Sequence, residues 1–240
     1  MKTIILAGGL GSRLAEETQD KPKPMVLIGD KPILWHIMNI YATQGFRDFI
    51  IAGGYKIKVI SKYIESLKEN WNIEVLDTGL NTQTAGRIKR CIQKENGERF
   101  FVTYGDGVAN VDLQNLITDH HKFGGLITLT AVRPPARFGS LQIVNNKVTH
   151  FGEKVQANQG WINGGYFILE KEILKYISSE NEPFETGPLP KLAADGQLYC
   201  HFHKKFWMPM DTLREKTELD KLARIKNIPW LKFRKKKFET

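Results

Sequence analysis

Short apolar runs alternate along this chain with stretches of helical spacing. Mostly apolar runs predict buried strands, and we expect strands at Thr3–Ala7, Asp48–Ala52, Ile73–Leu76, Arg99–Tyr104 and Leu126–Ala131. Apolar positions three and four residues apart predict amphipathic helices, at 32–43, 56–68, 84–95 and from Asp112 onward. Strands that alternate with helices imply right-handed βαβ units around a mostly parallel sheet.

The pattern changes after residue 138. Short extended pieces follow at 141–144, 147–151 and 165–169, and helical spacing returns near 186–194 and 212–226. We therefore expect an α/β fold: a doubly wound, mostly parallel, Rossmann-like sheet with a small mixed β extension and C-terminal helices. Since no linker divides the chain, we interpret 1–240 as a single domain. Within it, 1–137 form the core, 138–210 a second part, and 211–240 the C-terminal helix and basic tail.

Composition restricts the class of protein. The chain has 240 residues, 41% of them hydrophobic, which is enough for one large α/β core. Cys91 and Cys200 lie far apart without metal-binding spacing, which favours a reducing compartment. The first apolar run is too short for a signal peptide, and no segment approaches the ~18 apolar residues of a membrane span. We expect a cytoplasmic protein without membrane contact.

The net charge of +9 is compatible with nucleic acid or with phosphorylated small molecules as partners. Much of it lies in residues 232–237, which we interpret as a solvated basic end. Because the chain has no RNP motif, zinc-finger spacing or basic repeat, we expect no nucleic-acid partner. His120 and His121 are expected on the surface.

A glycine-rich segment directly follows the first predicted strand. Gly8, Gly9 and Gly11 let the backbone approach a ligand closely, and their N–H groups can face phosphate oxygens. Arg13 adds a planar charged fork, and Lys23, ten residues later, adds a point charge. A strand, a glycine loop and two cations together predict a nucleoside triphosphate site.

Other glycine-loop motifs do not fit this segment. A Walker A loop needs Lys-Ser or Lys-Thr after the glycines, and neither is present. A Rossmann fingerprint starting at Gly9 needs glycine or alanine where Leu14 stands. A tight turn with surface charges remains the simpler alternative.

Two aspartates follow extended segments in distant parts of the chain. Asp106 lies between Gly105 and Gly107, and Asp211 precedes the last predicted helix. Each has a simpler interpretation, Asp106 as a turn residue that caps the next helix and Asp211 as the N-cap of the last one. Together they could instead hold one Mg²⁺, which usually binds through one or two carboxylates and phosphate oxygens.

At this point the residues resemble a known family. Leu6–Leu14 with Lys21–Met25 is similar to the signature of the sugar nucleotidyltransferases. Further segments resemble the glucose-1-phosphate cytidylyltransferases within that family: 31–38, Asp77–Gly79, Gly86-Arg87, 103–108, Arg137–Gly139, Ile162–Gly165 and 210–214. The resemblance runs nearly end to end, in the family's order.

The resemblance implies a role for each matching residue. The CTP would be surrounded by Leu6, Ala7, Gly8, Gly9, Leu10, Gly11, Ser12 and Arg13, with Lys23 on its phosphates. Thr82, Gly86 and Arg87 would shape the cytosine pocket, and Gly105 would lie near the ribose. Asp106 and Asp211 would hold Mg²⁺, and Arg13, Lys23 and Asp106 would be catalytic. Glu153, Lys154, Asn163 and Gly164 would face the sugar phosphate.

The resemblance implies cytidylyl transfer from CTP to a sugar-1-phosphate, glucose-1-phosphate first, by a homo-oligomer. Relatives that use this sugar carry an insertion between the helix after Tyr55 and the strand before Asp77, and this chain lacks it. Two alternatives therefore stay open. One is the same chemistry with another base, UTP or dTTP, or another phosphorylated acceptor. The other is a non-catalytic regulator that binds nucleotides or RNA.

Overall fold

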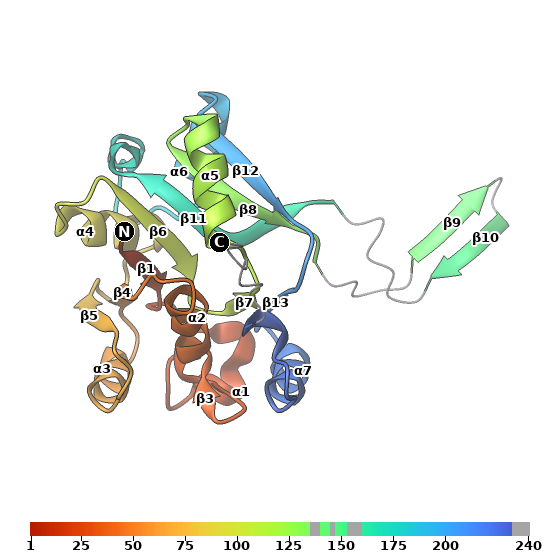
Figure 1. The fold of residues 1–240 in the computed structure, drawn as a ribbon, viewed down its shortest axis with the longest axis horizontal. Helices are drawn as coiled ribbons and strands as arrows, with labels where there is room; N and C mark the ends of the chain where they lie inside the picture. Colours follow the sequence, from red (N-terminus) through yellow and green to blue (C-terminus); the bar gives the residue numbers. More distant parts are fainter. Residues whose placement is uncertain (135–139, 145–146, 153–159, 232–240) are drawn as a thin grey trace, which may run out of the picture.

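The computed structural model describes residues 1–134, 140–144, 147–152 and 160–231 (Figure 1). A seven-stranded sheet forms the centre of the described chain. In sheet order its strands are β12 (Leu198–His203), β8 (Ile127–Val132), β11 (Ile162–Glu170), β6 (Arg99–Tyr104), β1 (Thr3–Leu6), β4 (Asp48–Gly53) and β5 (Asn72–Asp77). All neighbours pair in parallel except β11, which is antiparallel to both β6 and β8. The predicted mostly parallel α/β sheet is confirmed.

Helices cover both faces of this sheet because its strands are apolar on both sides. In β1, Ile5 belongs to one hydrophobic core while Ile4 and Leu6 belong to the other. The first core is covered by α2 (Ile33–Ala42), α3 (Ile57–Glu65), α5 (Leu113–Phe123) and α7 (Leu213–Ala223). The second is covered by α4 (Thr84–Gln93) and α6 (Pro188–Ala194). The sheet is therefore doubly wound.

Shorter elements complete the described chain. Strand pairs outside the central sheet are β2 (Leu27–Ile28) with β3 (Lys31–Pro32), β7 (Gly107–Ala109) with β13 (Trp207–Pro209), and β9 (Ser140–Val144) with β10 (Lys147–Gly152). Short helices are α1 (Ala15–Thr18) and the 3-10 turns η1 (Ser12–Leu14), η2 (Lys23–Met25), η4 (Lys171–Tyr176) and η5 (Pro229–Leu231). The β9–β10 pair matches the predicted small β extension.

The β7–β13 ribbon determines the position of the later site. Its antiparallel register places Gly107 opposite Pro209 and Val108 opposite Met208. Just beyond it, the Met210 N–H donates to the Asp106 carbonyl at 2.7 Å. Two segments a hundred residues apart are thereby held side by side where β6 ends.

The second part of the chain contributes to the central sheet as well as to the small β extension. β11 and β12 are members of the central sheet, and β11 lies between β6 and β8. Their apolar residues complete the same cores: Phe167 and Ile168 are fully buried in opposite ones. Residues 138–210 thus contribute both the small extension and two strands of the main sheet.

Side-chain surroundings decide the remaining predictions. His120 is buried, since its ring contacts Thr128 Oγ1 at 2.8 Å and Glu170 at 2.9 Å, so its surface prediction was wrong. Cys91 is buried in a core, and burial raises the pKa of its thiol to about 12.

Among the described residues, no helix is long and apolar enough to cross a membrane. The basic tail at 232–237 lies outside the described residues.

Candidate active site

A cavity of about 1460 Å³ opens at the carboxyl ends of the parallel strands. Ligands of open α/β sheets bind at this edge. Its walls come from the glycine loop 6–13, the segment 80–84, the end of β6, the start of β11 and the segment 207–215. The expected nucleotide residues line it, with the exception of Gly86.

The glycine loop lies against a buried arginine. A Cβ on Gly8 would come within 2.0 Å of the Arg87 guanidinium, so a glycine is needed there. Gly11 has a φ of 68°, a conformation that L side chains rarely adopt, and it precedes the η1 turn that carries Arg13. The loop therefore leaves backbone accessible to the cavity, as a phosphate cradle requires.

Arg87 ties three loops together behind this cradle. Its Nη1 donates to the Gly53 carbonyl at 2.9 Å and to Thr78 Oγ1 at 2.6 Å. Its Nη2 donates to the Gly8 carbonyl at 3.1 Å and the Leu80 carbonyl at 3.3 Å. Burial lowers the pKa of this guanidinium, although Arg87 still lines the cavity. Its donors are largely used on backbone, so Arg87 shapes the site from behind.

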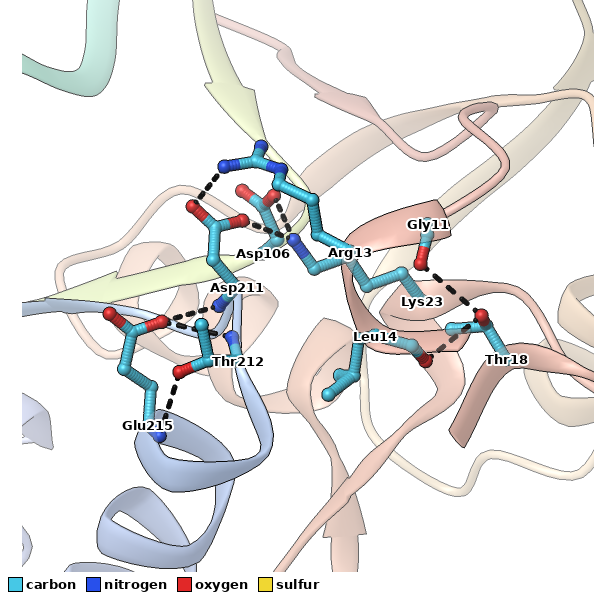
Figure 2. A network of polar contacts seen from close by, with 9 residues as sticks. All are labelled: Gly11, Arg13, Leu14, Thr18, Lys23, Asp106, Asp211, Thr212 and Glu215. Atoms are coloured by element: carbon cyan, nitrogen blue, oxygen red, sulfur yellow. Dashed lines mark hydrogen bonds and ion pairs between the residues drawn. The ribbon is translucent and has the colours of Figure 1, made fainter. Parts of the chain in front are cut away.

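Four charged side chains meet at the other end of the cavity (Figure 2). The Lys23 ammonium donates to Asp106 Oδ2 at 2.7 Å and to Asp211 Oδ1 at 2.6 Å. Arg13 Nη1 donates to the second oxygen of Asp211 at 2.7 Å. Although Lys23 is buried, Arg13 is largely exposed and can turn toward a ligand. The predicted convergence of the two acids is confirmed.

Neither aspartate serves as a helix cap, which was the simpler interpretation of both. The N-cap of α5 is Asp112, whose side chain accepts from the Asn115 N–H. The N-cap of α7 is Thr212, in a capping box with Glu215. Glu215 also accepts from the Asp211 N–H at 2.8 Å, so the backbone of Asp211 is held while its carboxylate stays in the cluster.

The donor set of this cluster suits a hard divalent ion. Two carboxylates lie within 2.7 Å of one cationic nitrogen, and oxygen ligands are those that Mg²⁺ prefers. Among the described residues, no group of three or more His, Cys, Asp and Glu could hold a metal. Water and the oxygens of a bound phosphate would complete the coordination of an ion held by these two carboxylates.

The expected sugar-phosphate residues are only partly placed. Asn163 lines the cavity, and Gly164 lies beside it, where its carbonyl accepts from the Trp207 indole at 2.8 Å. Glu153 and Lys154 lie outside the described residues. Gly86 faces away: a Cβ there would meet the Glu180 carbonyl at 2.3 Å, so it serves the packing of α4.

Sequence reasoning did not identify two further groups in the cavity wall. Arg214, three residues after Asp211 in the matched 210–214 segment, is exposed and lines the cavity. Glu185 also lines it, in a loop without any motif. The matched segment could have indicated Arg214, whereas no local signal marks Glu185.

Known proteins are similar to this chain over nearly its whole length. The model of the family described as "Nucleotidyl transferase" matches residues 2–215. A glucose-1-phosphate cytidylyltransferase of Salmonella typhi is 44% identical, over 96% of this chain and 98% of its own length. A probable glucose-1-phosphate cytidylyltransferase of Bacillus subtilis is 38% identical, over 92% of this chain and 96% of its own length.

Solved structures show the same fold. The crystal structure of HddC from Yersinia pseudotuberculosis has a TM-score of 0.74 and 28% identity, over 93% of this chain and 99% of its own. HddC has an equally similar crystal structure complexed with GMP-PN. The alignment with the Salmonella typhi relative spans 253 positions against 240 residues here, so that relative has residues without a counterpart in this chain.

Proposed function

This chain belongs to the nucleotidyl transferase family, and from that membership we propose that it transfers a cytidylyl group from CTP to a sugar-1-phosphate. The products are a CDP-sugar and pyrophosphate. Glucose-1-phosphate is the acceptor we propose, because the relatives that match over nearly the whole chain are named for it. The observation that carries the proposal is the meeting of Arg13, Lys23, Asp106 and Asp211 beside a glycine loop.

The nucleotide would lie along the loop from Leu6 to Arg13. Gly9 and Gly11 line the cavity, so their backbone N–H groups could face phosphate oxygens, and the adjacent Arg13 would neutralise the charge of those oxygens. The base would lie toward Thr82 and Arg87, with the ribose near Gly105. A Cβ on Gly105 would meet the Leu6 carbonyl at 2.7 Å, so only glycine lets β6 end this close to β1.

Asp106 and Asp211 would hold the divalent ion, which we propose to be Mg²⁺. Bound there with the triphosphate, the ion would neutralise charge that develops on the phosphate oxygens. Lys23 forms a hydrogen bond to each carboxylate. Once a metal ion binds the two carboxylates, the ammonium would be placed to donate one of these hydrogen bonds to a phosphate oxygen instead.

The reaction needs no general base from the protein. A phosphate monoester has its second pKa near ~6, so at pH 7 the attacking oxygen is mostly deprotonated. That oxygen forms a bond to the α-phosphorus while the bond to the bridging oxygen breaks, and the electron pair leaves with pyrophosphate. Charge repulsion between the two anions is the obstacle, and Arg13 and Lys23, with Lys154 as a further proposed cation, would lower it.

A nucleotidyltransferase with another base is the alternative. HddC was crystallised with GMP-PN, and mannose-1-phosphate guanylyltransferase of Dictyostelium discoideum is 32% identical over 87% of this chain. The segment 81–87 must separate the bases. A cytoplasmic location and a homo-oligomer remain predictions.

A pyrophosphate-release assay tests the proposal. The full chain is given each of four nucleoside triphosphates with a panel of sugar-1-phosphates and Mg²⁺. We expect turnover with CTP and glucose-1-phosphate, and at least tenfold less with other bases. Equal use of all bases would contradict the base assignment, and turnover with a different sugar would reassign the acceptor.

A further inference from the structure

A carboxylate on the cavity wall lies apart from the phosphate-binding cations. Glu185 Oε1 accepts from the Tyr104 hydroxyl at 2.5 Å, and its Oε2 accepts from Thr84 Oγ1 at 2.9 Å. In the described part of the chain, Glu185 forms no ion pair with a lysine, arginine or histidine. The cavity that we propose to receive two phosphorylated anions thus contains a carboxylate that has no cationic partner among the described residues.

Glu185 is also linked to the start of β11. The Tyr104 oxygen, which donates its proton to Glu185, accepts from Asn163 Nδ2 at 3.3 Å. Asn163 Oδ1 in turn accepts from the Gly165 N–H at 2.9 Å. The orientation of the Asn163 amide is therefore set from both ends.

The backbone of β11 is shaped to permit this contact. The pairing of β11 with β8 shifts register between Asn163 and Phe167. Gly165 has a φ of 79°, and a Cβ there would come within 2.5 Å of the Tyr104 ring.

An ionised carboxylate accepts hydrogen bonds and offers none. It repels phosphate oxygens, and the free lone pairs of Glu185 favour a ligand that brings neutral O–H or N–H donors. The amide of Asn163 is linked to Glu185 through the Tyr104 hydroxyl, and the cavity is also lined by Trp207, whose indole binds the carbonyl of Gly164 next to Asn163. A carboxylate, an amide and an aromatic ring suit a polyhydroxylated ring with one hydrophobic face.

Building on the proposed function, we propose that Glu185 is a specificity-determining residue that accepts a hydroxyl of the sugar ring. Tyr104 and Thr84 are its positioning residues. Glu185 thereby selects acceptors that carry a free hydroxyl at one ring position.

The test uses Glu185→Gln, which preserves size while removing charge, and Tyr104→Phe, which retains the ring packed on Phe167. With the triphosphate that the wild type uses best, we expect Glu185→Gln to raise KM for glucose-1-phosphate at least tenfold. Its kcat should stay within about threefold, and KM for the triphosphate within about twofold. Tyr104→Phe should show a smaller change in the same direction.

Deoxy sugar-1-phosphates identify the hydroxyl. The wild type should lose at least tenfold in kcat/KM with one deoxy analogue, and Glu185→Gln should use that analogue and the parent sugar equally well. If every deoxy analogue lowered kcat/KM by the same factor in Glu185→Gln as in the wild type, the inference would be overturned. A changed ratio of CTP to dCTP, or of CTP to UTP, would also overturn it, since Glu185 would then contact the ribose or the base.

The protein contains a matched control in Tyr176, whose hydroxyl donates to Asp195 at 2.9 Å outside the cavity. Tyr176→Phe and Asp195→Asn should leave both KM values unchanged. Calorimetric titration with glucose-1-phosphate separates this inference from the proposed function. Weaker binding to Glu185→Gln than to the wild type would support the inference even if CTP proved to be the wrong nucleotide. Equal binding would refute it.

Discussion

The contacts of Lys23 predict that its removal opens the site to a metal ion. In the structure the Lys23 ammonium bonds both carboxylates, at 2.7 and 2.6 Å, and the side chain is only 9% exposed. A divalent ion that engages Asp106 and Asp211 together would compete with this ammonium for their oxygens. Lys23→Met should therefore lower the free energy of unfolding in the absence of metal. It should also raise the affinity for a divalent metal ion when no nucleotide is present.

The size of the effect follows from burial. Removing one partner of a buried ion pair costs about 3–5 kcal/mol. Asp106 and Asp211 are 33% and 17% exposed, and water screens the charges left behind, so we expect about 2–3 kcal/mol. That corresponds to a drop in Tm of about 4–12 °C for a chain of this size. In the wild type a metal ion must displace the Lys23 contacts and so lose this free energy, whereas in Lys23→Met it does not. The metal should therefore bind the variant about 30- to 150-fold more tightly.

Mn²⁺ provides the assay, because its free concentration can be followed by electron paramagnetic resonance without nucleotide. Thermal melting with and without Mn²⁺ should show a larger stabilisation of Lys23→Met than of the wild type. Lys21→Met is the control, since Lys21 reaches Glu17 only at 3.8 Å on the surface. If Lys23→Met bound Mn²⁺ no more tightly than the wild type, the ammonium would not compete with the metal.

Three further predictions concern separate parts of the molecule. Asp106→Asn should lower kcat by about 10²–10³ with an unchanged circular dichroism spectrum; near-normal pyrophosphate release would remove Asp106 from the site. Arg87→Met should lower the free energy of unfolding by about 3 kcal/mol in urea melts, because the Gly8 carbonyl and three other acceptors lose their donor. An unchanged urea midpoint would refute this role. His36 Nδ1 accepts from the Trp230 indole at 3.3 Å, and its pKa is lowered, chiefly by burial. Only the unfolded chain then takes up this proton just below pH 6.5, so stability should fall as the pH drops from 6.5 to 5.5, and less steeply in His36→Gln; equal slopes of Tm against pH would contradict it.

Several parts of the site could be predicted from the sequence because their signals are local. The apolar run before Gly8 predicted a buried strand, and the glycines with Arg13 and Lys23 predicted an anion site beside it. Asp106 was identified because it follows an apolar strand between two glycines. In each case the relevant residues lie close together in sequence, in one strand or in the segment that follows it.

Other features depend on pairing between distant segments. Glu185 contacts Tyr104 and Thr84 across 81 and 101 residues of sequence, so no spacing marks it. His120 is a polar residue in a predicted helix, and the sequence alone does not show which face of that helix is buried. Its burial is possible because Thr128 and Glu170 form hydrogen bonds with its two ring nitrogens. Polar residues become buried when partners from elsewhere complete their hydrogen bonds, and a linear pattern does not contain those partners.

The sequence by itself determined the alternation of strands and helices, since the spacing of apolar residues records which side of each element is buried. It also determined the charged groups and the loop available for chemistry. Only the tertiary structure decided that the β7–β13 ribbon brings Asp211 to Asp106, that β11 enters the main sheet in reverse, and that Arg87 supports the loop from behind. Those outcomes depend on hydrogen-bond pairing and packing between remote segments, which are decided only when the chain packs around the cores on the two faces of the sheet.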